Sequence, residues 1–326
     1  MTVVEAPAGG TDRSRRKRRL LFVLKLVFSL SILAVIILTK APLAEIGRVL
    51  SGVRLPWILI AFALNAVGLL ASAYRWQILA RVQGDEIPLA FLAKSYLVGL
   101  FFSHFLPSSF GGDIVRIWDG SRYSRSLLKS SAIVAVERGT GLAVLFFFAL
   151  VASLFRVEMA RDIPFIWVSL ALGAGGLALV AFFLLPVSGR WLSRLPARGW
   201  LGRIREKTLE FRSFVLQYAR RPGPFMLATF WAFVLQVNVV IYYYLIGLAF
   251  GLPIPFLDYF IIIPIVLLVQ IVPVTINGLG LREGAYIALF AAYGTTAGTA
   301  VSFSIVDVAL RLVVGIIGGL VYMARK

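Results

Sequence analysis

Apolar residues run in long blocks along this chain, and charged residues gather between the blocks. Six blocks are long enough to cross about 30 Å of hydrocarbon as helices. They lie near residues 20–38, 56–74, 130–155, 165–186, 223–250 and 298–323. Two further apolar stretches, 88–118 and 256–293, are interrupted by proline and glycine. The pattern predicts an all-α polytopic membrane protein with about six full spans and two broken segments.

The two interrupted stretches share one kind of sequence. Residues 105–116 read FLPSSFGGDIVR and residues 272–283 read VPVTINGLGLRE, so each runs from proline through hydroxyl residues and glycine to arginine. Proline lacks an N–H and glycine is costly in a helix, so each stretch predicts an unwound helix. Unwound backbone at membrane depth must be buried in protein or line a cavity. A matched pair of such segments, one in each half, indicates a transporter's binding site.

The amino-acid composition excludes several kinds of functional site. The chain has 326 residues, 60% of them apolar, and lacks cysteine, which excludes disulfides and thiolate metal sites. Its mean hydropathy is +0.90. His104 is the single histidine, so we expect no histidine-built metal site, and no sequence motif calls for a cofactor. The net charge of +18 is spread over loops between apolar blocks, which indicates membrane topology rather than nucleic-acid binding.

The basic loops predict an orientation. Residues 1–19 form a basic cytoplasmic tail before a first helix that has no small-residue cleavage site. The loops 75–87 and 116–129 are also basic and should be cytoplasmic, so the stretch between them predicts a re-entrant hairpin. The second broken stretch then enters from outside, and the C-terminus is cytoplasmic. The alternative is that the broken stretches cross the membrane as full spans, giving eight spans in place of the hairpins.

The predicted elements fall into two halves. Membrane repeat 1 covers 20–155, an outer loop covers 156–164, and membrane repeat 2 covers 165–326. Each repeat has two spans, a broken hairpin and a final span, and the repeats start on opposite sides, which predicts an inverted-topology repeat. Residues 187–222 in repeat 2 carry nine basic residues and helical apolar spacing. They predict an amphipathic cytoplasmic connector.

Each final span carries an acid and an arginine, which are costly inside a bilayer. Asp307 and Arg311 are spaced to pair on one helix face, whereas Glu137 and Arg138 are adjacent and need separate partners. One interpretation is that these are ion pairs that hold the bundle together. The other is that the arginines bind an anionic headgroup and the acids tune or release them, or carry coupling protons.

The broken motifs also predict an anion-binding site. A half-helix that starts after the glycines of each motif presents free backbone N–H groups at its N-terminus. The alternative is a purely structural kink. The candidate headgroup-binding residues are Arg116, Arg138, Arg282, Arg311, Ser108, Ser109, Gly111, Gly112, Thr275, Asn277, Gly278 and Gly280. The candidate coupling or ion-pair residues are Asp113, Glu137, Glu283 and Asp307.

An enzyme is not expected. His104, Ser108, Ser109 and Asp113 include the residue types of a hydrolase triad, but nothing in the sequence orients a histidine between a serine and an acid. The aromatic run 242–244 near a span end predicts an outer interfacial belt.

At these motifs the chain resembles the flippase-like transmembrane domain of the lysylphosphatidylglycerol synthase family, which includes stand-alone members. The matching segments are PSSFGGDIVR at 107–116, ERGTGL at 137–142 and NGLGLREG at 277–284. The resemblance spans about residues 20–326 and implies a lipid-translocating membrane domain with these residues around the pathway. The two-domain synthases carry an aminoacyl-transfer domain after the membrane part, and this sequence ends at Lys326, so lysyl transfer is not implied.

The function expected from the sequence is translocation of a phosphate-bearing lipid across a bacterial inner membrane. The alternatives are a lipid-binding scaffold for a separate lipid- or glycan-modifying enzyme, and a membrane-embedded transferase. The expected partners are the membrane and an anionic or phosphate-bearing lipid such as a phospholipid or a polyprenyl phosphate, but no nucleic acid. The lipid, the direction, the coupling ion, and a homo-oligomer or partner enzyme stay open.

Overall fold

The computed structural model describes residues 12–105, 111–155, 157, 164–194, 196, 198–271, 275 and 278–325. All regular elements in these ranges are helical. The first half contains α1 (Asp12–Thr39), α2 (Leu43–Ser51), α3 (Leu55–Val82), α4 (Leu89–Phe105), α5 (Gly111–Ser124) and α6 (Leu127–Phe155). The second half contains α8 (Pro164–Leu184), α9 (Pro186–Ser193), α10 (Gly199–Gln217), α11 (Pro222–Ala249), the short turn η1 (Phe256–Asp258), α12 (Tyr259–Ile271), α13 (Leu281–Ala291) and α14 (Ala297–Ala324).

Helices of spanning length account for the predicted crossings. By length and composition α3, α6, α8, α11 and α14 can each cross a membrane, and α1 with α2 forms a sixth apolar pair bent by 82°. Many large apolar side chains on these helices are exposed, including Leu38, Leu154 and Leu179. Exposed apolar surface of this extent is stable only against lipid, so the chain is a polytopic membrane protein.

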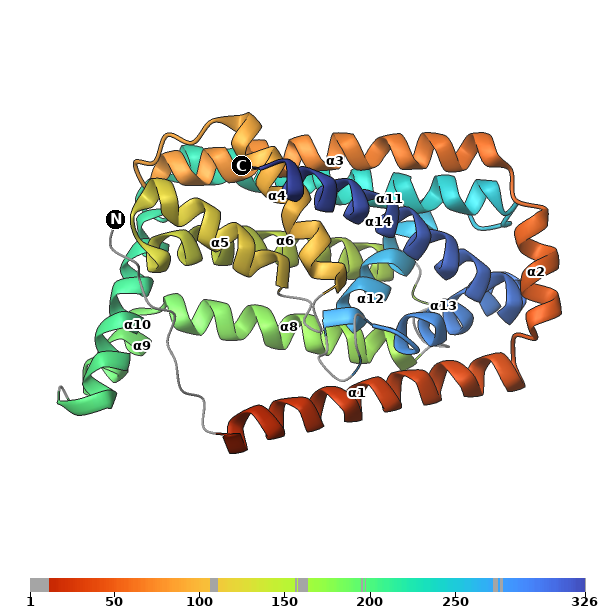
Figure 1. Ribbon diagram of the computed structural model, residues 1–326, viewed down its shortest axis with the longest axis horizontal. Coiled ribbons are helices and arrows are strands. Elements are labelled where there is room, and N and C mark those ends of the chain that lie inside the picture. Colours follow the sequence, from red (N-terminus) through yellow and green to blue (C-terminus); the bar gives the residue numbers. More distant parts are fainter. Residues whose placement is uncertain are drawn as a thin grey trace.

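The broken stretches form two helical hairpins. Within the first, α4 packs against α5, and within the second, α12 packs against α13. The four helices are 17, 14, 13 and 11 residues long, shorter than the roughly 20 residues that a full span needs. Figure 1 shows α4 and α5 reaching inward from the end of the molecule where α10 lies, and α12 and α13 from the end where α2 lies. We call these the α10 end and the α2 end.

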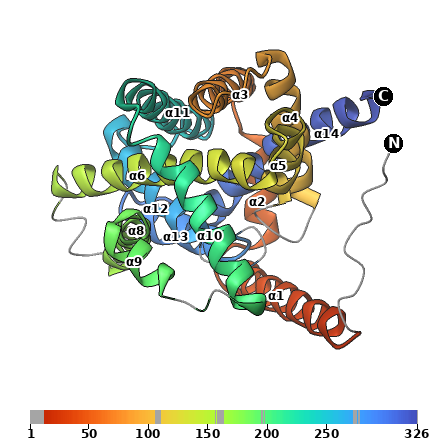
Figure 2. The ribbon, with the colours of Figure 1, turned by 90° about the vertical axis from the view of Figure 1, so that its left-hand side faces the viewer.

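Equivalent helices of the two halves pack in equivalent pairs. Helix α3 lies along α11, while the first hairpin packs on α14 through α4 and the second packs on α6 through α12. Each final span also contacts its own hairpin, α6 through α5 and α14 through α13. This exchange of contacts is what a two-fold related pair of repeats would make. Figure 2 shows α12 and α13 in the middle of the bundle, whereas α4 and α5 lie at its side next to α3.

Glycines set the closest approaches of the first hairpin. A Cβ on Gly112 would overlap the carbonyl oxygen of Gly99 on α4, and a Cβ on Gly318 would overlap the carbonyl oxygen of Leu97. Helix α4 is therefore held between α5 on one side and α14 on the other by contacts that only glycine permits.

The connector between the halves lies across the α10 end of the bundle. It consists of two helices, α9 and α10, rather than one, and Figure 2 shows α10 crossing in front of the spans. Arg212 donates to the carbonyl oxygens of Phe183, Leu184 and Leu185 at 2.9–3.0 Å, which fastens α10 to the C-terminus of α8. Tyr218 donates to the carbonyl oxygen of Leu79 at 3.0 Å, and burial raises the pKa of its hydroxyl.

Two predicted boundaries were wrong. Helix α3 continues to Val82, so Arg75 is a helical residue, 4% exposed, and not part of a basic loop. Helix α5 likewise extends to Ser124, so Arg116 is helical and 3% exposed. Both errors arise because intramembrane charge lowers local hydropathy and makes a helix look as if it has ended. The short helix α2 was not predicted.

Candidate functional site

The first hairpin brings its charged residues against α6. Helix α5 begins at Gly111, and the N–H of Gly112 donates to Ser103 Oγ on α4 at 3.2 Å. One turn further, Arg116 pairs with Glu137 of α6. Tyr96 Oη of α4 donates to the other oxygen of that carboxylate at 2.6 Å. Glu137 therefore joins three helices at one point.

Aromatic rings cover the buried guanidinium of Arg116. Its Cζ lies 3.9 Å from the ring centroid of Tyr96 and 4.5 Å from that of Trp76. Stacking of this kind stabilises a guanidinium where water is excluded. The rings of Tyr96 and Trp76 thus shield the guanidinium of Arg116 from water.

A second ion pair links the same two helices. Arg138 Nε and Nη2 donate to the two carboxylate oxygens of Asp113, each at 2.9 Å. This is the bidentate geometry that fixes both groups. The Arg138 side chain is nevertheless 61% exposed, whereas that of Asp113 is 8% exposed. Arg138 is therefore the part of this cluster that reaches the surface.

A third guanidinium comes from α3. Arg75 donates to the backbone carbonyl of Glu137 and to Thr140 Oγ1, so its partners are neutral oxygens. We call Arg75, Asp113, Arg116, Glu137 and Arg138 the first cluster.

The second hairpin fastens its charges differently. Arg282 Nε and Nη2 donate to Oε1 of the adjacent Glu283 at 3.1 and 2.6 Å. Glu283 Oε2 accepts the N–H of Gly280 at 2.6 Å, which closes the first turn of α13. Ser304 Oγ of α14 donates to Glu283 at 2.7 Å. The hydrogen bond from α14 to the carboxylate of Glu283 thus comes from a neutral hydroxyl.

Helix α14 carries its own ion pair. Asp307, fully buried, pairs with Arg311 one turn away. Tyr242 and Tyr243 of α11 donate to the two oxygens of Asp307 at 3.2 and 3.3 Å. We call Arg282, Glu283, Asp307 and Arg311 the second cluster.

The inner end of the first hairpin approaches the second cluster. A Cβ on Gly315 of α14 would lie 3.8 Å from the ring of His104 on α4, and Gly315 is one turn from Arg311. His104 Nδ1 lies 2.9 Å from the carbonyl oxygen of Leu100 on its own helix. His104 thus lies at a contact between the two halves.

The predicted pairings can now be compared with the structure. The expectation that Glu137 and Arg138 need separate partners is confirmed, as is the i,i+4 pair of Asp307 and Arg311. Gly278 and Gly280 have φ of +76° and +86°, so the unwound turn before α13 requires glycine. Thr275 is 7% exposed. Ser108, Ser109 and Asn277 lie outside the described residues.

Sequence reasoning missed Tyr96 in these networks and misplaced Arg75, Tyr242 and Tyr243. Arg75 was assigned to a loop, and Tyr96 carried no signal beyond an aromatic in an apolar helix. The expectation of an outer aromatic belt was wrong for Tyr242 and Tyr243, which are 7% and 3% exposed and bond Asp307. A hydroxyl on a helix that faces an intramembrane acid is the signal that could have found them.

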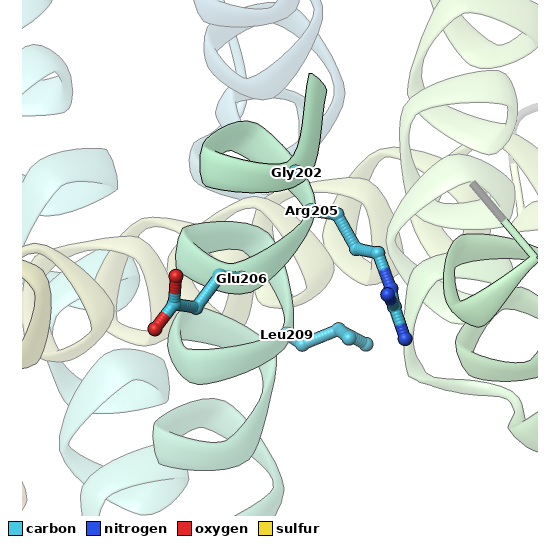
Figure 3. Close-up of a pocket in the computed structure, with 4 residues that line it drawn as sticks. All are labelled: Gly202, Arg205, Glu206 and Leu209. Carbon is cyan, nitrogen blue, oxygen red and sulfur yellow. The ribbon is translucent and has the colours of Figure 1, made fainter. Parts of the chain in front are cut away.

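A hollow on the connector lies apart from both clusters in the chain. Gly202, Arg205, Glu206 and Leu209 of α10 line it, and Figure 3 shows Arg205 and Glu206 pointing to opposite sides of the helix. We do not assign the function to it, because the buried ion pairs on the hairpins and final spans lie in the two clusters.

Comparisons with known proteins agree with this architecture. The family model described as "Lysylphosphatidylglycerol synthase TM region" matches residues 22–319, which include both hairpins and both clusters. Two proteins of Methanothermobacter thermautotrophicus, each named UPF0104 membrane protein, are also similar. One is 26% identical over 302 residues, covering 86% of this chain and 88% of that protein. The other is 24% identical over 296 residues, covering 82% of each. The chain therefore belongs to the family of the lysylphosphatidylglycerol synthase transmembrane region.

Proposed function

We propose that this protein moves a phosphate-bearing lipid between the leaflets of a bacterial inner membrane. The observation that carries the proposal is the pair of broken hairpins that enter from opposite ends and pack on final spans with buried charge. Arg116 of the first hairpin pairs with Glu137 of α6, and the second hairpin contacts α14, which carries the pair of Asp307 and Arg311. Two such half-crossings offer a polar route that neither a sealed bundle nor a single hairpin provides.

The orientation follows from the basic residues at the α10 end. We propose that α9, α10 and both termini face the cytoplasm, because nine basic residues lie in 187–222. The first hairpin would then open to the cytoplasmic leaflet and the second to the outer leaflet.

The arginines have different roles in this proposal. Arg138, with its side chain 61% exposed, is the candidate for direct contact with the lipid phosphate, whereas Arg311, 31% exposed, stays paired with Asp307. Arg116 and Arg282 are 3% and 5% exposed and pair with carboxylates, so they hold the hairpins in place. Glu137 and Asp307 belong to the same ion pairs, and we assign them to positioning rather than to proton transfer.

Reconstitution of the purified chain tests the proposal. Liposomes of phosphatidylcholine would contain a trace of headgroup-labelled phosphatidylglycerol, and a membrane-impermeant reductant added outside would bleach the label. We expect the protein to expose the inner-leaflet label to bleaching, whereas protein-free liposomes protect it. Equal protection with and without the folded protein would refute translocation.

An arginine-to-lysine pair sharpens this test. Arg138→Lys keeps the charge but loses the planar fork, so it should slow translocation by about tenfold. The control is Arg190→Lys on α9, an exposed residue of the connector, which should leave the rate unchanged.

A further inference from the structure

The first cluster carries one positive charge that no acid in it balances. Arg75, Arg116 and Arg138 contribute three guanidinium groups, and Asp113 and Glu137 contribute two carboxylates. The adjoining residues 106–110 of the hairpin contain no acid in the sequence. An unbalanced charge within a membrane costs several kcal/mol unless a counter-charge or water reaches it.

Arg75 is the guanidinium without a carboxylate among the described residues. It is 4% exposed, its hydrogen bonds go to a backbone carbonyl and a hydroxyl, and its buried Nε has no partner in the described part of the chain. Gly141 of α6 lies beside this guanidinium, since a Cβ there would be 3.7 and 3.8 Å from the two terminal nitrogens of Arg75. Gln236 Nε2 donates to the Gly141 carbonyl at 3.4 Å, which brings the amide of a fourth helix, α11, close to the same point.

The second cluster has no such excess. Arg282 and Arg311 are matched by Glu283 and Asp307, and the remaining partners are hydroxyls of Ser304, Tyr242 and Tyr243. The two halves therefore share a backbone plan but differ by one charge.

We propose that the first cluster binds one phosphodiester group with a single negative charge, between Arg75 and the surface-reaching Arg138, and that the second cluster binds none. The source of the phosphodiester as a lipid headgroup rests on the proposed function; the anion site itself does not. A monoanionic phosphodiester would make the cluster neutral, which favours it within a low-dielectric bilayer. A zwitterionic lipid brings its own cation and leaves the excess charge in place. A phosphomonoester carries nearly two negative charges and would leave the cluster with a net negative charge.

Native mass spectrometry of the full chain in a neutral detergent tests this assignment. Phosphatidylglycerol and phosphatidylcholine with the same acyl chains would compete at equal concentration. The key variant is Thr140→Asp, which gives Arg75 a carboxylate of its own and neutralises the cluster without deleting a guanidinium. We expect the wild-type protein to prefer phosphatidylglycerol by about tenfold or more, and Thr140→Asp to abolish that preference.

Two further variants serve as a control and as a second test. Arg81→Gln removes an exposed cation from the same helix and should keep the preference within about twofold. If Thr140→Asp does not fold, Arg138→Gln at the exposed end should reduce the preference by a similar factor. Equal binding of both lipids by the wild type, or full preference in the folded Thr140→Asp protein, overturns the site.

Inorganic phosphate separates the two sources of the anion. Protection of the wild type against thermal unfolding by phosphate, lost in Thr140→Asp and unaccompanied by a lipid preference, would assign the site to free phosphate and overturn the lipid source. Lipid preference without translocation in liposomes would refute the proposed function and leave the site standing. Translocation without any headgroup preference would refute the site alone.

Discussion

In the first half of the chain three guanidinium groups share two carboxylates across α3, α5 and α6, whereas in the second half two guanidinium groups meet two carboxylates on α13 and α14. Both arrangements hold a broken hairpin against a final span. The first does so by ion pairs between α5 and α6, and the second by the neutral hydroxyl of Ser304 on α14. Tyr242 and Tyr243 add hydroxyls from α11 to Asp307 of α14. Similar backbone plans can therefore carry unequal charge, and the excess marks the half in which an anion is expected.

Labelling should separate the two hairpins completely. A cysteine at Ser121 on α5 lies toward the α10 end, and a cysteine at the exposed Ala292 lies just beyond α13. Because the chain has no native cysteine, each single-cysteine variant reports one site. We expect an impermeant maleimide added outside intact cells to label position 292 and not 121. Labelling of both positions from outside would reject the opposed orientation.

Removing one carboxylate from each half should have unequal effects on stability. Glu137→Gln removes the closer of the two carboxylates of Arg116, which is 3% exposed, and leaves Asp113 at 3.5 Å to be shared with Arg138, which should cost about 3–5 kcal/mol. Asp307→Asn keeps oxygen and amide groups toward Tyr242 and Tyr243, and Arg311 is 31% exposed and can extend toward water. Its cost should be about 1–2 kcal/mol.

Thermal unfolding in detergent, followed by fluorescence-detected size exclusion, would compare the two variants. An equal decrease of the unfolding midpoint in both variants would show that the first cluster contributes no more to stability than the second.

A glycine substitution should give a smaller effect in the first hairpin. Gly112→Ala places a methyl group on the backbone of Gly99 and on Ser103, and should cost about 1–3 kcal/mol by pushing α4 from α5. The matched control is Gly175→Ala in α8, where a Cβ meets nothing within 4 Å. The control should be neutral or stabilise slightly, since alanine favours helix. The unfolding midpoints of the two variants are compared in the same assay. An unchanged midpoint for Gly112→Ala would mean that α4 and α5 are not closely packed.

Sequence pattern predicted the spans well and the contacts unevenly. The six apolar blocks and two broken segments could be predicted, because hydropathy and the effects of proline and glycine on a helix depend on residues that are close in the sequence. The pair of Asp307 with Arg311 could also be read, because helical spacing fixes it. The partners of Glu137 and Arg138 could not, because they depend on how α5 packs on α6. Arg75 was missed because a buried charge near a helix end looks like the start of a loop.

The most direct test of the account is the rate at which liposomes containing the Thr140→Asp protein expose labelled phosphatidylglycerol, compared with wild type. The substitution adds a carboxylate beside Arg75 and removes no guanidinium. If an unbalanced charge in the first cluster carries the lipid phosphate, the folded variant should translocate the label at least about tenfold more slowly than wild type. A folded Thr140→Asp protein that translocates the label at the wild-type rate would contradict the account.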